Sequence, residues 1–222
     1  MDDRLIVTAS PHIRDNATTR GLMGNVLIAL VPSIVASGLI FGMRAILLTA
    51  VTTLACVVFE YLYCKLMHKP IPCKDLSAAI TGVLLVFVCP VTLPYWMIII
   101  GDFFAIVVVK QLFGGIGDNF MNPALTARGI MLASWPVRMT AWYLPTFCKG
   151  VDAVSSATVL GGYEASTYDM FMGFIPGTIG EVSKIAILIG FIYLLIRKVI
   201  SWRIPVVFVG TFAVLAAIFR MD

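Results

Sequence analysis

Charged residues are scarce in this 222-residue chain, and their scarcity excludes most classes of soluble protein. Only 13% of the residues are Asp, Glu, Lys or Arg, against about 25% in a typical soluble domain. Hydrophobic residues make up 60% of the chain, and the mean hydropathy is +0.98. The net charge of +4 is too small to favour nucleic acid as a partner. The composition therefore predicts an all-α fold, a polytopic membrane helical bundle in the lipid bilayer.

Two kinds of catalytic or metal-binding motif are also missing. The chain has only two histidines, His12 and His68, and neither belongs to a Ser-His-Asp arrangement, which disfavours hydrolase chemistry. The five cysteines are scattered without a C-x-x-C pair, unlike the clustered ligands of zinc or iron–sulfur sites. We therefore predict no metal site and no catalytic residue in this chain alone.

The first twenty residues are polar, so we do not expect them to be a cleavable signal peptide.

Apolar stretches predict about seven membrane spans, because a helix needs about 20 mostly apolar residues to cross a bilayer. In chain order they run from Leu22 to Phe41, from Ala45 to Cys64, from just after Asp75 to Val91, from Tyr95 to Phe113, from Pro123 to Trp135, from Val182 to Ile196 and from Ile204 to Phe219. The fifth stretch is short, so we expect broken helices as well as complete spans.

The basic residues indicate which side of the membrane each end faces. Ten of the 16 Lys and Arg residues would lie on the side of the N-terminal arm and five on the other side, with Arg128 inside the fifth span. Because positive charge favours the inside, we expect a cytoplasmic N-terminus in the bacterial cytoplasmic membrane. The chain then divides into a cytoplasmic arm (1–21), membrane helices 1–5 (22–135), a long external loop (136–180) and helices 6–7 (181–222).

Two acidic residues, Glu60 and Asp102, fall within predicted spans. An ionisable side chain at membrane depth is a functional hypothesis by default. Glu60 lies near the cytoplasmic end of the second span, where Lys65 could pair with it. Asp102 lies about two turns into the fourth span. Each could belong to an ion or proton path, or could instead make a structural contact with a neighbour.

A glycine-rich turn, residues 114–124, follows the fourth span. Asn122 is predicted to cap the next helix and Pro123 to occupy its first turn. Such a helix start can present free N–H groups and a positive dipole to an anionic ligand. Asn119 in the turn and Arg128 one turn further on could contribute to that site. A tight turn that only lets two helices pack is the alternative.

The predicted external loop contains a run of small and hydroxyl-bearing residues, Asp152-Ala-Val-Ser-Ser-Ala-Thr158. Its small side chains leave the hydroxyl of Thr158 open to a modifying enzyme. From the residues alone, an ordinary polar loop is the better explanation of the run.

Four stretches, taken in order, resemble the RnfD/NqrB family. They are Ser10-Pro-His-Ile-Arg14, the stretch 75–82 that opens the third span, the run 110–124, and the stretch from Gly180-Glu-Val-Ser183 to Ser201-Trp-Arg-Ile-Pro205. Members of this family are subunits of the Rnf ion-translocating electron transport complex and of the sodium-pumping NADH:quinone reductase.

The resemblance implies a flavin mononucleotide (FMN) joined through its phosphate to a threonine hydroxyl. The acceptor signature of the family is similar to Asp-Gly-x-Ser/Thr-Gly/Ala-Ala-Thr, which assigns the acceptor role to Thr158. The other residues of the attachment motif are then Asp152, Ser155, Ser156 and Ala157. The chain departs from the signature at Ala153 and at Ser156, and both residues are small.

The resemblance also implies partners and a larger assembly. A flavin transferase would attach the FMN outside the membrane, and the neighbours would be other Rnf-complex subunits, including an external FMN-bearing subunit and small membrane subunits. Riboflavin or a second flavin is a further expected cofactor. The complex would couple electron transfer from ferredoxin to NAD with export of Na⁺ or H⁺. Family members have about ten spans in two related halves, so further spans are expected beyond those found here. A channel, a small-solute carrier or an assembly scaffold without a redox role is the alternative.

Overall fold

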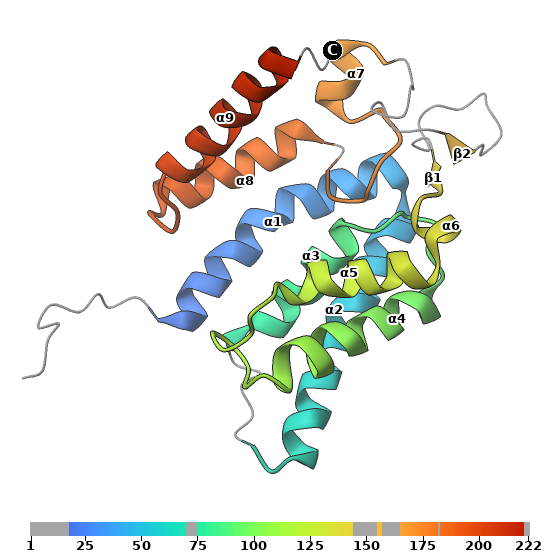
Figure 1. The fold of residues 1–222 in the computed structure, drawn as a ribbon, viewed down its shortest axis with the longest axis vertical. Helices are drawn as coiled ribbons and strands as arrows, with labels where there is room; N and C mark the ends of the chain where they lie inside the picture. Colours follow the sequence, from blue (N-terminus) through green and yellow to red (C-terminus); the bar gives the residue numbers. More distant parts are fainter. Residues whose placement is uncertain (1–17, 70–74, 144–154, 157–164, 182, 220–222) are drawn as a thin grey trace, which may run out of the picture.

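Two long apolar helices open the part of the chain that the structure describes, which comprises residues 18–69, 75–143, 155–156, 165–181 and 183–219 of the computed structural model (Figure 1). Helix α1 is Thr19–Phe41 and helix α2 is Met43–Leu66. Thr18 caps α1 by accepting a hydrogen bond from the backbone N–H of Gly21 at 3.1 Å. Both helices are long and apolar enough to cross a membrane. The predicted N-terminal arm lies almost wholly outside the described residues.

Four further segments pack with α2 into a bundle. They are α3 (Ser77–Phe87), α4 (Tyr95–Phe103), the π-helical η2 (Phe104–Gln111) and α5 (Pro123–Ser134). Helix α4 continues directly into η2, so the predicted fourth span is one helix with a change of winding. The largest fully buried apolar side chains are Leu48, Leu85, Leu93, Met97, Ile98, Ile106, Met131, Met139 and Ile179.

The segment 136–180 contains short elements rather than a long helix. These are α6 (Pro136–Met139), β1 (Trp142–Tyr143), β2 (Ser155–Ser156) and α7 (Thr167–Met172). The two strands pair antiparallel, with Trp142 opposite Ser156 and Tyr143 opposite Ser155. Where the chain is described, this pair is the one departure from a helical fold.

Helix α8 (Lys184–Ile196) lies against α1 (Figure 1). The two helices approach closely at Gly190, where a Cβ atom would collide with the carbonyl oxygen of Ala29. The Asn25 side-chain oxygen accepts hydrogen bonds from the Tyr193 hydroxyl at 3.0 Å and from Arg197 Nε at 3.3 Å. Because Asn25 is near the start of α1 and Arg197 follows α8, the two helices run antiparallel.

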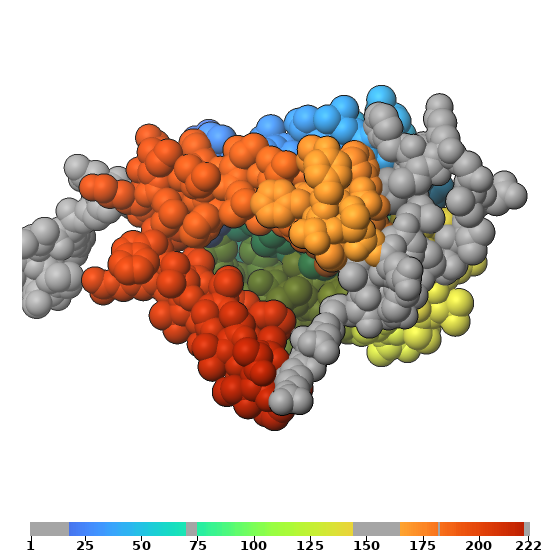
Figure 2. Space-filling view, turned by 90° about the horizontal axis from the view of Figure 1, so that it is seen from above, coloured from blue at the N-terminus to red at the C-terminus, as the bar shows by residue number. Residues whose placement is uncertain are grey.

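Helix α9 (Arg203–Phe219) stands apart, and none of its described residues is buried. Seen from above in Figure 2, α9 (red) projects from the molecule, with a hollow between it and the helices coloured green. Helices α3, α8 and α9 are apolar but shorter than a full span. The helices match the seven predicted stretches closely, while the number that cross a membrane stays a prediction.

The helices alternate in direction as the span prediction requires. At one end of the bundle, the Arg44 guanidinium donates hydrogen bonds to the carbonyl oxygens of Val91, Thr92 and Leu93 at 2.9–3.4 Å. The turn between α1 and α2 therefore lies beside the turn between α3 and α4. At the other end, the end of α2, the start of α3 and the end of η2 meet around a polar cavity.

Candidate functional site

A buried ion pair joins α2 to η2. Lys110 Nζ lies 2.6 Å from Glu60 Oε1, and the two side chains are 4% and 1% exposed. The Gln111 side chain donates a second hydrogen bond to the same oxygen at 2.9 Å. Lys110 and Gln111 are the last two residues of the π-helical segment η2, and both side chains contact Glu60. The other carboxylate oxygen, Glu60 Oε2, is buried and has no hydrogen-bond partner.

The ion pair extends into a hydrogen-bonded network at the start of α3. Lys110 Nζ also donates to the Ser77 hydroxyl, which in turn donates to Asp75 Oδ1 at 2.8 Å. Asp75 Oδ1 accepts the Ser77 backbone N–H as well, at 3.0 Å, so this carboxylate fixes the first turn of α3. The Cys64 thiol lies 3.9 Å from Gln111 Oε1. The network therefore links α2, η2 and α3, because Lys110 on η2 donates both to Glu60 on α2 and to Ser77 on α3.

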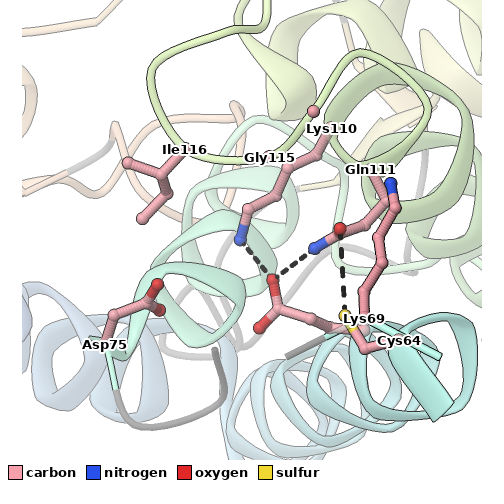
Figure 3. A pocket seen from close by; sticks show the side chains of 9 residues that line it. Cys64, Lys69, Asp75, Lys110, Gln111, Gly115 and Ile116 are labelled. Atoms are coloured by element: carbon pink, nitrogen blue, oxygen red, sulfur yellow. Dashed lines mark hydrogen bonds and ion pairs between the residues drawn. The ribbon is translucent and has the colours of Figure 1, made fainter. Parts of the chain in front are cut away.

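A cavity of about 350 Å³ opens beside this network (Figure 3). Asp75 and Lys69 lie on opposite sides of the cavity, and Lys110 reaches into it from η2. Five of its nine lining residues carry a charged or amide side chain, and the glycine-rich turn completes the cavity; the residues are Glu60, Cys64, Lys69, Asp75, Lys110, Gln111, Gly114, Gly115 and Ile116. A cavity with both acids and lysines suits a small ion or a polar group better than an apolar ligand.

A second buried acid, Asp102, lies between α4 and α2. Its carboxylate oxygen Oδ1 accepts a hydrogen bond from the Cys56 thiol at 3.3 Å. Asp102 and Cys56 are both 0% exposed, and Asp102 Oδ2 has no hydrogen-bond partner. A charged carboxylate is costly in such surroundings. A nearby cation would offset that cost, and a bound proton would remove the charge.

The glycine-rich turn has the predicted helix cap. The Asn122 side chain accepts hydrogen bonds from the backbone N–H groups of Ala124 at 3.0 Å and Leu125 at 3.2 Å. The Asn119 side chain donates to the carbonyl oxygen of Met121 at 2.8 Å. Positive φ angles at Gly114, Gly115 and Gly117 show why the turn needs glycine.

Those contacts bear on the anion site predicted at this helix start. Asn122 already occupies two of the N–H groups at the start of α5, and Asn119 is used within the turn. Arg128 can still donate a hydrogen bond to a ligand, since its Nε is buried and has no hydrogen-bond partner. The anion site at this turn stays a prediction, and the Arg128 guanidinium is the group there with an unsatisfied donor.

The predicted flavin attachment motif is described only in part. Ser155 and Ser156 form β2, which pairs with β1. Asp152, Ala157 and Thr158 lie outside the described residues. Within the described ranges, no group of three or more His, Cys, Asp or Glu side chains could hold a metal ion.

The predicted partner of Glu60 is wrong. Lys65 is exposed, and its Nζ lies 5.8 Å over the ring of Tyr61. Lys110 takes the expected role of Lys65, because Glu60 faces the interior of the bundle and Lys65 faces outward. One sequence signal bears on this pair: Lys110 is the only basic residue within the stretch from Tyr95 to Phe113, and a charge at membrane depth tends to pair. That signal does not specify which acid Lys110 meets.

The chain is similar to several bacterial proteins along nearly its whole length. The sequence profile of the NQR2, RnfD, RnfE family matches residues 6–222. The D component of the Na(+)-translocating ferredoxin:NAD(+) oxidoreductase complex of Acetobacterium woodii is 44% identical over 98% of this chain and 70% of the relative. The D component of the proton-translocating ferredoxin:NAD(+) oxidoreductase complex of Clostridium ljungdahlii is 38% identical, over 94% and 67%. The D component of the ion-translocating oxidoreductase complex of Rhodobacter capsulatus is 34% identical, over 95% and 68%.

Proposed function

The chain belongs to the NQR2, RnfD, RnfE family, and from this premise we propose that it is a membrane subunit of an ion-translocating ferredoxin:NAD⁺ oxidoreductase complex. The relatives in three bacteria are all named as the D component of an ion-translocating oxidoreductase complex. The apolar helices α1 and α2 support the membrane location. The chain has no recognisable nucleotide-binding motif in its sequence, so ferredoxin and NAD would meet other subunits.

The redox group of this subunit would be FMN, joined by a phosphoester bond to the Thr158 hydroxyl. The run Asp152-Ala-Val-Ser-Ser-Ala-Thr158 supports this assignment by its similarity to the acceptor signature. The antiparallel pairing of Ser155–Ser156 with Trp142–Tyr143 anchors the middle of the motif, two residues before Thr158. When bound, the flavin supplies the electron-transfer chemistry, and the chain supplies the tether and the position.

The arrangement in the membrane would put the attachment motif outside the cytoplasm. The excess of basic residues on the side of the N-terminus supports this orientation. This orientation requires successive helices to alternate in direction. The fold supports that requirement, because the turn at Arg44 and the turn at 91–93 lie at the same end of the bundle. The subunit would then exchange electrons near the outer face with an external FMN-bearing subunit and with small membrane subunits, after a flavin transferase has loaded it.

A second, non-covalent flavin or another anionic cofactor would bind near Arg128. The unpaired, buried Arg128 Nε supports this, since an anionic group would satisfy it. The exported ion would be Na⁺ or H⁺, since the Acetobacterium relative is named for the first ion and the Clostridium relative for the second.

The single observation that carries the covalent-flavin proposal is the attachment motif, and it can be tested directly. Chain produced in a host with a flavin transferase should show flavin fluorescence in a denaturing gel. Mass spectrometry should find FMN on the peptide that contains Thr158. Thr158→Ala should abolish both signals, and Thr167→Ala, which changes a threonine outside the motif, should leave both unchanged.

Flavin retained by denatured Thr158→Ala protein would contradict the assignment. The channel or carrier alternative predicts a different result from the same preparation. It requires solute transport by the purified chain without redox partners, and no flavin fluorescence in the wild-type band.

A further inference from the structure

A row of buried polar side chains runs along one face of α2. Thr52, Cys56, Glu60 and Cys64 are spaced by four residues, and each is at most 1% exposed. Four residues advance a helix by about 6 Å, so the row extends over about 18 Å. It begins at the cavity, which Glu60 and Cys64 line, and it leads into the interior of the bundle.

Asp102 lies beside this row, one helical turn beyond Glu60. Its Oδ1 is bonded to the thiol of Cys56, and its Oδ2 is buried without a partner. Glu60 Oε2 is likewise buried without a partner. Two carboxyl groups with unused oxygens therefore lie along one helix face, and the first of them borders the cavity.

Two thiols interact with the Asp102 carboxyl group, Cys56 on α2 and Cys89 after α3. Cys56 in turn interacts with Glu60 and Lys110, and Cys89 interacts with Arg128. Lys110 is committed to Glu60 and to Ser77. No described cation forms an ion pair with Asp102, and its single hydrogen-bond donor is a thiol.

We propose that Asp102 is a proton-binding carboxyl group at the inner end of a proton path, which opens at the cavity and passes Glu60 and its partner Lys110. A proton fits the site better than a metal cation, because a metal ion needs several oxygen ligands and, within the described ranges, the side-chain hydrogen bond of the Asp102 carboxylate comes from a thiol and no group of three or more His, Cys, Asp or Glu side chains could hold a metal ion. When Asp102 binds the proton, one O–H bond forms and the buried charge is neutralised. When the proton leaves, that bond breaks and the carboxylate regains its charge. Nothing is oxidised or reduced in either step.

The inference deepens the proposed function, since it assigns part of the ion path to this subunit and rests on its membership in a translocating complex. The experiment uses the intact complex in proteoliposomes, with wild type, Asp102→Asn, Asp102→Glu and Asp118→Asn compared. Asp118→Asn is the matched control, because Asp118 is an exposed acid on the turn after η2. Dicyclohexylcarbodiimide, which modifies protonated carboxyl groups in apolar surroundings, is the probe, and mass spectrometry locates the modified peptide.

The expected result is modification of the Asp102 peptide in the wild type and in the Asp118→Asn protein, without protection by Na⁺. Ferredoxin-driven proton translocation should fall about tenfold or more in Asp102→Asn, as expected when a positioned proton-transfer group is removed. Asp102→Glu should recover part of the loss. NAD reduction in ionophore-treated vesicles and the FMN on Thr158 should stay at wild-type levels in every variant.

Three outcomes would overturn the proposal: full proton translocation by Asp102→Asn, no modification at Asp102 in the wild type, or protection of Asp102 by Na⁺, which would indicate a sodium site instead. Failure of the proposed function is distinguishable in the same samples. It would appear as an unmodified Thr158 peptide in the wild type, whereas the carbodiimide reaction at Asp102 can be read on the chain with or without flavin.

Discussion

Lys110 neutralises Glu60 from a different helix, at a distance of 2.6 Å and with both side chains hidden from solvent. Buried pairs of this kind gain little net stability, because desolvation of the two charges offsets their attraction. We infer that the pair in this bundle favours one arrangement of the helices over the alternatives. The Ser77 and Gln111 contacts reinforce this role, since they satisfy the pair only when α2, α3 and η2 meet as they do here.

Removing one partner of this pair should be costly. We predict that Lys110→Met lowers the free energy of unfolding by about 3–5 kcal/mol, because it leaves the Glu60 carboxylate buried and unpaired. The double variant Glu60→Gln with Lys110→Met should be clearly more stable than Lys110→Met alone. Thermal unfolding in detergent measures both effects.

Lys65→Met is the matched control for that comparison. Lys65 is exposed and only five residues from Glu60, so its loss should change the unfolding temperature little. Equal destabilisation by Lys65→Met and Lys110→Met would mean that the buried pair has no special part in stability.

The positions of the helices could be predicted from the sequence, and their lateral contacts could not. Uncharged apolar stretches located α1 and α2 to within a few residues, and the Asn122-Pro123 pair correctly predicted the start of α5. Both are local signals. The choice of Lys110 over Lys65 as the partner of Glu60 depends on which helix face turns inward, and that is set by contacts between helices.

The π-helical winding of η2 was beyond the reach of sequence patterns for the same reason. Nothing in Phe104–Gln111 differs locally from an ordinary apolar helix. The last two residues of this segment, Lys110 and Gln111, both contact Glu60 on α2, and such a contact between helices is not encoded in the local sequence. Pairing of β2 with β1 is likewise a contact between segments separated in the chain.

The contact between α1 and α8 gives a second prediction. Gly190→Ala should destabilise the protein, because the added methyl group would collide with the backbone carbonyl of Ala29, which cannot rotate away as a side chain can. Gly210→Ala in α9 is the control, since a Cβ atom there meets nothing within 4 Å. It should be neutral or stabilising by about 0.5–1 kcal/mol. Unfolding temperatures that fall equally in both variants would show that helix packing at Gly190 is not the cause.

The cap of α5 gives a third prediction. Asn122→Ala should cost about 1 kcal/mol, because two backbone N–H groups at the helix start lose their acceptor. Asn122→Asp keeps an oxygen in the same place and should retain most of the stability. Hydrogen exchange of the Ala124 and Leu125 amides should be faster in Asn122→Ala alone, and unchanged exchange would contradict the cap.

The unpaired Arg128 gives a fourth prediction, which separates a cofactor contact from a structural one. If an anionic cofactor binds this guanidinium, Arg128→Ala should weaken retention of non-covalent flavin about tenfold or more, since a hydrogen bond to a charged group contributes about 1.5–3 kcal/mol. Arg128→Lys keeps the charge and should retain part of the binding, while Arg138→Ala, which changes an exposed side chain of α6, should have no effect. Flavin released from the denatured complex measures the non-covalent fraction, and fluorescence of the protein band measures the covalent one. A loss confined to the non-covalent fraction fits a binding role, whereas unchanged flavin with a lowered unfolding temperature would make Arg128 a packing residue.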